Sequence, residues 1–123
     1  ARDGHKVSRR NMMNPAEEPE VPYVTQCLAP TEGPIIAATD YIRAHTNQIR
    51  EFMPRSFTVL GTDGFGRSDT RAQLREFFEV DRRYVVLAAM TALADEGVVS
   101  RADVAKVMTD LGIDPAKPDP TTV

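Results

Sequence analysis

The sequence predicts an α/β fold in which short apolar strands alternate with helices. The clearest strand is the apolar run Phe57–Leu60, which a glycine-rich turn connects to a helical pattern beginning near Thr70. A second apolar run, Ile35–Thr39, also precedes a segment with helical spacing. Alternation of strands and helices is typical of a parallel sheet covered by helices. At most three strands accompany four helices, too few for a well-covered sheet, so we expect further strands to precede Ala1.

The composition limits the classes of protein to which the chain can belong. Its 123 residues make one domain at most, and 41% hydrophobic with 27% charged residues is typical of a globular chain. The formal net charge of −3 gives no electrostatic basis for binding nucleic acid or an anionic membrane. No apolar run approaches the ~18 residues that a membrane-spanning helix needs. We therefore expect neither a nucleic-acid nor a membrane partner.

The first part of the chain, residues 1–34, is predicted to be an irregular segment that crosses the domain. Ala1–Gly4 resembles the last turn of a helix with its glycine cap, and the first residue is not Met, so we expect the chain to be a piece of a longer one. Five prolines follow within residues 5–34 and break any long element. The short run Val21–Val24 is interpreted as an edge strand or an extended crossing. The partial domain itself is assigned to residues 35–113 and a tail to residues 114–123.

The middle of the chain is predicted to contain two strands and a helix. The run Ile35–Ala38 forms either a buried strand or part of the approach to the helix. Thr39 or Asp40 is then the N-cap of a helix that continues through Met53 and ends at Pro54.

Three helices are predicted after the glycine-rich turn. The first is short and is capped by Asp69 or Thr70. The second begins at Asp81, closes at Gly97 and is apolar nearly all round, which predicts burial on most sides.

The third of these helices has signals at both ends. Ser100 with Asp103 three residues later is a variant of the capping box. Gly112 followed by Ile113 predicts a Schellman-type end.

Cysteine and histidine are too sparse to predict a catalytic or metal site. The single cysteine, Cys27, excludes an internal disulfide and is compatible with a reducing, cytoplasmic compartment; we expect it to be a small buried hydrophobic side chain. His45 falls beside Tyr41 and Ile49 on its helix and is expected to be partly buried, whereas His5 is expected to be exposed. We assign no catalytic and no metal-binding residue.

The glycine-rich turn Gly61–Asp69 is the most distinctive motif. Its glycines allow positive φ and close approach to another surface. Arg67 and the loop amides could meet an anion, but Asp63 and Asp69 would repel phosphate, and the lysine of a Walker loop is missing. We therefore favour a tight structural turn or a domain-contact loop over a ligand site. The residues assigned to this contact loop are Gly61, Asp63, Gly64, Phe65, Gly66, Arg67 and Asp69.

An arginine row begins in the same motif. Arg67, Arg71 and Arg75 follow at i, i+4 and i+8, and therefore share one face of the helix after the loop. Such a row is usually a solvated face. Its alternative role is to pair with carboxylates of an adjoining domain or subunit.

Taken together, these motifs resemble the C-terminal, transketolase-like domain of the homodimeric pyruvate dehydrogenase decarboxylating component. Their order and spacing agree along essentially all 123 residues. The loop Gly61–Asp69 is the most specific of them, and the wider transketolase family keeps a looser Asp-x-Phe-Gly-x-Ser form. The matching stretches are Ala1–Gly4, Asn11-Met12 with Pro15, Val21–Val24, Thr39–Tyr41, Gly61–Asp69 and Phe78–Asp81.

The resemblance implies a fold, an activity and partners for a longer parent enzyme. The fold is a mixed sheet with flanking helices, here lacking its first strands. The parent oxidatively decarboxylates pyruvate on thiamine diphosphate and Mg, and passes the acetyl unit to a lipoyl group of dihydrolipoyl acetyltransferase. Both cofactors lie between the preceding domains, across a homodimer interface, so this chain is expected to bind no cofactor.

The role implied for this piece is structural, and alone it is expected to be inactive. The Gly-Asp-Gly cofactor motif needs a downstream asparagine, and no asparagine follows Asn47. Two alternatives remain: a stand-alone α/β interaction module, and a piece of another transketolase-type 2-oxo acid dehydrogenase.

Overall fold

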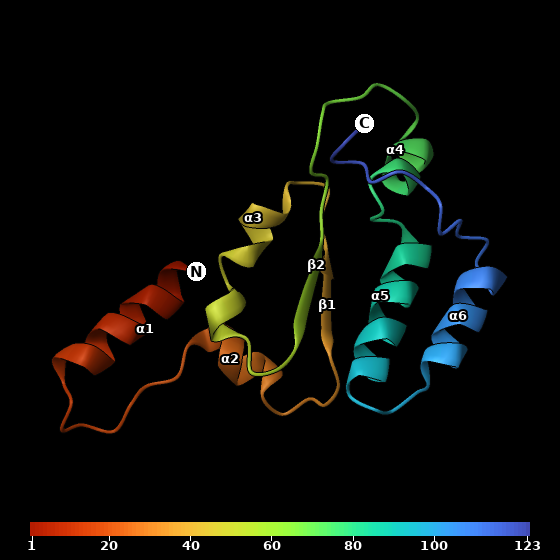
Figure 1. The fold of residues 1–123 in the computed structure, drawn as a ribbon. Coiled ribbons are helices and arrows are strands. Elements are labelled where there is room, and N and C mark those ends of the chain that lie inside the picture. The colour runs from red at the N-terminus through yellow and green to blue at the C-terminus, as the bar shows by residue number, and fades with distance from the viewer.

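The computed structural model describes all 123 residues and has a small parallel sheet between two groups of helices. Figure 1 shows α2 and α3 on one side of the strands and α5 on the other, with α6 outside α5 and α1 projecting at the N-terminal end. In chain order the elements are α1 (Arg2–Met13), α2 (Tyr23–Leu28), β1 (Ile35–Ala38), α3 (Arg43–Asn47), the 3₁₀ helix η1 (Arg50–Phe52), β2 (Phe57–Leu60), α4 (Arg71–Phe77), α5 (Arg82–Asp95) and α6 (Arg101–Asp110).

The two strands pair in parallel, from Ile35 opposite Phe57 to Ala38 opposite Leu60. Phe57 and Val59 are buried on one face of the sheet. Arg50 covers that face from η1: its guanidinium lies 5.2 Å from the centre of the Phe57 ring, and its Nη1 donates to the Phe57 carbonyl at 2.7 Å. Helix α5 packs against both strands. The predicted α/β class is confirmed, and the sheet formed by these residues is a parallel pair.

The regular elements predicted from residue 35 onwards are largely confirmed. Ile35–Ala38 is a strand rather than the approach to a helix. The hydroxyl oxygen of Thr70 accepts a hydrogen bond from the Gln73 N–H, and so caps α4. Asp81 caps α5, and Ser100 with Asp103 forms the complete capping box of α6.

The predicted Schellman end of α6 is also present. The Ile113 N–H donates to the Met108 carbonyl at 3.1 Å, and Gly112 has the positive φ of 68° that this motif needs. Helix α4 ends with the same pattern of bonds, but there the left-handed position is occupied by Glu79, with φ 62°. Glu79 is held by Lys117, whose Nζ lies 3.1 Å from its carboxylate.

The prediction of an irregular segment over residues 5–34 is wrong, because α1 and α2 lie within it. The prolines limit these helices without preventing them: Pro15 follows α1, and Pro22 stands at the N-cap of α2, where a missing N–H costs nothing. The run Val21–Val24 is therefore not an edge strand, since Tyr23 already begins α2.

Ala1–Gly4 is not the end of a helix either. Gly4 lies in the first turn of α1 and is buried, because α1 meets η1 there. A Cβ atom at Gly4 would overlap the ring of Phe52. The absence of a side chain thus serves close packing and not a cap.

The single helix predicted through Met53 is replaced by α3, which starts only at Arg43, and by η1. The two predicted caps are engaged elsewhere. The Thr39 hydroxyl accepts from the Tyr41 N–H at 3.1 Å, and the Asp40 carboxylate accepts from Arg75 of α4. The chain bends at Asp40 and Tyr41, and α3 begins only after the extended Ile42.

Two predictions of burial are wrong. Cys27 is exposed, and so is His45, whose ring lies 5.3 Å from that of Tyr41. Helix α5 matches its prediction in part: Tyr84 and Ala92 are buried, most of its other residues are half-buried, and only Arg82, Val86 and Asp95 are exposed. The error has one cause: periodicity identifies apolar faces, but it does not say whether this chain provides a surface to cover them. The exposure predicted for His5 is confirmed.

Candidate binding site at the glycine loop

The base of the loop Gly61–Asp69 is tied to the segment between β1 and α3. The Thr62 N–H donates to the Tyr41 carbonyl at 2.9 Å, and its hydroxyl donates to the Asp40 carbonyl at 2.7 Å. Gly61 is buried at this junction, where an added Cβ would lie 2.8 Å from the Arg43 nitrogen. The first glycine is therefore required by close approach of two backbone segments.

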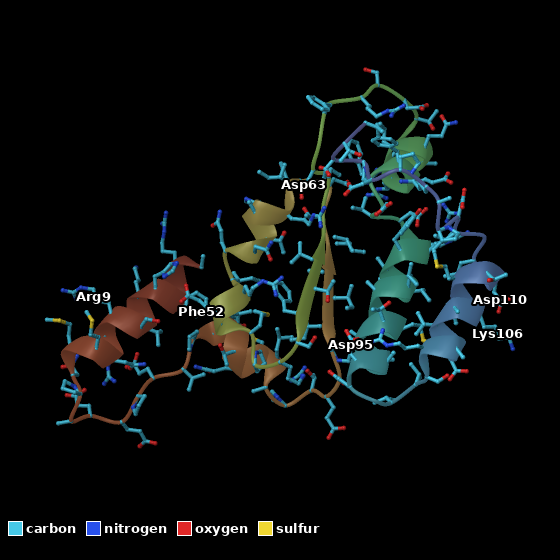
Figure 2. All side chains as sticks on the ribbon, in the orientation of Figure 1. Arg9, Phe52, Asp63, Asp95, Lys106 and Asp110 are labelled. Carbon is cyan, nitrogen blue, oxygen red and sulfur yellow. The ribbon has the colours of Figure 1, made fainter.

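Asp63 fastens the loop to α3. Figure 2 labels it near the end of β2. Its carboxylate accepts from the Arg43 backbone N–H at 3.1 Å and from Arg43 Nε at 2.6 Å. Because Ile42, the N-cap of α3, makes no side-chain cap, Asp63 caps this helix from a distant part of the chain. The pairing also neutralises a carboxylate that the sequence suggested would repel anions.

The C-terminal residues support the middle of the loop. Gly64 has φ 112°, and an added Cβ would lie 2.5 Å from the Pro120 carbonyl oxygen. Pro120 itself is buried. Residues 114–123, assigned as a tail, have no regular secondary structure but pack on the loop and on α4, where Lys117 donates to the Phe77 carbonyl.

The apex of the loop is open. Phe65 is 72% exposed, and an added Cβ at Gly66 would meet no atom within 4 Å. None of the backbone N–H groups of residues 64 to 69 donates a hydrogen bond within the chain. The apex therefore presents a row of unpaired donors beside one exposed aromatic ring.

The three arginines of the predicted row have two kinds of partner, a carboxylate and an aromatic ring. Arg75 makes a bidentate contact with Asp40, at 3.2 Å for Nε and 3.0 Å for Nη2. This hydrogen bonding lowers the pKa of the Asp40 carboxyl below its ordinary value. Arg71 reaches the same carboxylate only at 3.9 Å, and the Arg67 guanidinium lies 3.9 Å from the centre of the Phe77 ring.

A cavity of about 530 Å³ lies between the loop and α4. Its charged lining consists of the three arginines and two aspartates, Asp40 and Asp69, while Asp63 is not part of it. The remaining lining residues are Thr62, Gly64, Phe65, Gly66, Leu74 and Phe78. The structure thus gathers five of the seven loop residues assigned from the sequence around one hollow, while Gly61 and Asp63 lie outside it, at the base of the loop.

Sequence reasoning missed the residues that complete this site. The local pattern predicts only a helix cap for Asp40 and only a place in a tail for Pro120. The spacing of the arginines indicated a carboxylate partner, but nothing in the local pattern showed that this partner precedes the loop by more than 20 residues.

Outside the loop, one histidine faces a carboxylate. His5 Nδ1 lies 3.7 Å from the Glu51 carboxylate, and both side chains are exposed. No group of three or more His, Cys, Asp or Glu side chains is placed to hold a metal ion. None of the helices is long and apolar enough to cross a membrane.

Comparison with known proteins identifies a family model and several relatives that this chain matches. Residues 7–81 match the family model of the transketolase-like TK C-terminal domain. Over all 123 residues the chain is 54% identical to the pyruvate dehydrogenase E1 component of Cupriavidus necator. It is 51% identical to the protein of that name from Pseudomonas aeruginosa over 120 residues (97% of this chain), and 45% identical to that from Escherichia coli over 121 residues (98%). The chain spans 14% of the length of the first two relatives and 13% of the third.

Proposed function

This chain belongs to the family of transketolase-like C-terminal domains, and from that membership we propose that it is the C-terminal structural part of a pyruvate dehydrogenase decarboxylating component. The observation that carries the proposal is the 54% identity to such an enzyme over the entire chain. The other relatives described above bear the same name, which favours pyruvate over a different 2-oxo acid.

The proposal extends to the parent enzyme. It oxidatively decarboxylates pyruvate on thiamine diphosphate and Mg in the cytoplasm, and transfers the acetyl unit to the lipoyl group of dihydrolipoyl acetyltransferase. Preceding domains hold both cofactors. The present chain provides a scaffold, since the polar groups at the base of its most distinctive loop are engaged with one another: Asp63 with Arg43, and Thr62 with the backbone of residues 40 and 41.

We further propose that the exposed apolar side chains face the remaining domains or the homodimer partner. They include Phe65 at the loop apex, Met12 and Met13 at the C-terminal end of α1, and Tyr23 at the start of α2. Met12 and Tyr23 are 71% and 70% exposed. Large exposed apolar groups that lie together are typical of interaction surfaces.

A domain exchange tests the proposal directly. The matching region of the Cupriavidus necator enzyme is replaced by these 123 residues, and pyruvate-dependent reduction of an electron acceptor is measured. We expect the chimera to be active and the enzyme without the region to be inactive. A chimera carrying Phe52→Asp, which disrupts the core of this domain, is the matched control and should lose activity. A folded but inactive wild-type chimera would contradict the proposal.

Calorimetry tests whether the cofactors are bound by the preceding domains and not by this chain. The 123-residue chain titrated with thiamine diphosphate and Mg²⁺ should show no binding, whereas the active chimera should bind. Micromolar binding by the chain alone would show that it holds part of the cofactor site.

A further inference from the structure

We propose that the cavity between the glycine loop and α4 binds a small monocarboxylate with an apolar body, which Arg67 and Arg71 hold by its charged end. This role goes beyond the structural function proposed above and does not depend on it.

Two guanidinium groups of this cavity have N–H donors that no carboxylate of the chain occupies. Arg67 has no carboxylate within 4.0 Å and stacks on the Phe77 ring, which covers one face of its guanidinium and leaves the N–H edge free. Arg71 is 77% exposed, and its nearest carboxylate, at 3.9 Å, is already held by Arg75. Arginine forks bind carboxylates through paired N–H groups, so both are suited to a second, external carboxylate.

The charge balance favours a single negative charge. Asp40 and Arg75 neutralise each other, and Asp63 lies outside the cavity, paired with Arg43. Arg67 and Arg71 then face only Asp69, whose carboxylate also accepts the Thr70 N–H at 2.8 Å. The net charge of +1 is cancelled by a monocarboxylate, whereas a phosphate dianion would leave an excess negative charge beside Asp69.

The rest of the lining suits an apolar body. Phe65, Leu74 and Phe78 supply apolar surface around a volume of about 530 Å³, which falls in the range of small-molecule sites. The backbone N–H groups of residues 64 to 69 make no hydrogen bond within the chain, and most of these residues line the cavity. An arylacetate is a ligand of this chemistry, so phenylacetate serves as the probe.

The experiment is a titration of the full chain with phenylacetate, followed through the amide resonances of residues 64 to 69 and supported by equilibrium dialysis. We expect saturable shifts at these amides. Phenylacetamide, which has the same shape without the charge, should bind at least about tenfold more weakly, since a charge-assisted contact is lost.

Substitutions test which side chains bind. Arg67→Gln and Arg71→Gln should each raise the dissociation constant about tenfold. Arg82→Gln, at an exposed position in the first turn of α5, is the matched control and should not change it. Circular dichroism confirms that each variant is folded, and dialysis with the active chimera repeats the measurement in a complete enzyme.

Three results would overturn the proposal. The first is equal binding of phenylacetate and phenylacetamide, and the second is unchanged affinity in the Arg67→Gln and Arg71→Gln variants. The third is binding of phenyl phosphate about tenfold tighter than phenylacetate, which would assign the cavity to phosphate esters instead.

Discussion

Two glycines, Gly4 and Gly61, lie where a second segment of the chain leaves no room for a side chain. At Gly4 the neighbour is the ring of Phe52, which is only 6% exposed, and at Gly61 it is the backbone of Arg43 and Tyr41. The periodicity of the sequence does not show that these two positions need glycine instead of alanine. Each glycine nevertheless determines how closely two elements approach.

Gly4→Ala is expected to lower the free energy of unfolding by about 2 kcal/mol, because the new Cβ overlaps a buried ring that has little room to move. Urea denaturation followed by circular dichroism measures the change. Gly66→Ala is the matched control and should be nearly neutral, since nothing lies within 4 Å of its added Cβ. Equal stability of Gly4→Ala and the wild type would show that α1 does not dock on Phe52.

Asp40 makes stability depend on pH. Hydrogen bonding from Arg75 lowers its folded-state pKa, so its contribution is present above the unfolded value of about 3.9 and is lost as the pH falls through the folded pKa. We expect the urea midpoint of the wild type to fall below about pH 4, and to fall less in Asp40→Asn. Asp110→Asn, on the exposed end of α6, should keep the wild-type acid profile. If the urea midpoint of Asp40→Asn falls with pH in parallel to that of the wild type, the Asp40–Arg75 pair is not a source of acid sensitivity.

At the scale of elements, two short helices are capped from outside. The Tyr23 N–H at the start of α2 donates to Asp3 of α1 at 2.8 Å, and the Arg43 N–H at the start of α3 donates to Asp63 of the loop. Neither helix has an N-cap side chain of its own. Their formation is therefore coupled to the docking of α1 and of the glycine loop.

Asp63→Ala is expected to lower the free energy of unfolding by about 1–2 kcal/mol, the usual cost of losing an N-cap, and to speed hydrogen exchange in α3. Asp63→Asn should cost less, because the amide oxygen still accepts the Arg43 N–H. Asp110→Ala, at the far end of α6 in Figure 2, should change neither property. Unchanged exchange in α3 would disprove capping by the loop.

At the scale of the whole molecule, the core is small. Only ten of 123 residues are buried, and of these only Phe57 and Val59 belong to the strands. Figure 1 shows α1 reaching away from the sheet. Its last two residues, Met12 and Met13, are exposed. With so few buried residues, folding removes little apolar surface from water per residue.

The isolated chain is expected to associate in a concentration-dependent manner, because contact between two copies buries their exposed apolar side chains. Sedimentation velocity measures the mass against the 13.6 kDa of the monomer. Combining Met12→Gln, Met13→Gln and Tyr23→Ser should shift the distribution towards the monomer, whereas Val98→Gln, a single exposed position between α5 and α6, should have a smaller effect. A cooperative, strictly monomeric wild type would favour the stand-alone interaction module.

Local signals determined much of the fold after residue 35. The apolar run Phe57–Leu60, the caps at Thr70, Asp81 and Ser100, and the Schellman end at Gly112 each act within a few residues, so a linear pattern is enough to predict them. The same is true of the family resemblance, which short motifs carry in order along the chain. Similarly, the glycine loop was correctly placed between a strand and a helix.

Tertiary structure alone decided what those elements contact. Asp40 became the partner of Arg75 instead of a helix cap, Gly4 a packing site instead of a helix end, and Cys27 an exposed side chain instead of a buried one. The hollow beside the loop exists because Arg75 and Asp40 meet across 35 residues and Pro120 returns to Gly64. A residue's periodicity describes its own element, whereas burial and pairing depend on which distant segment arrives beside it.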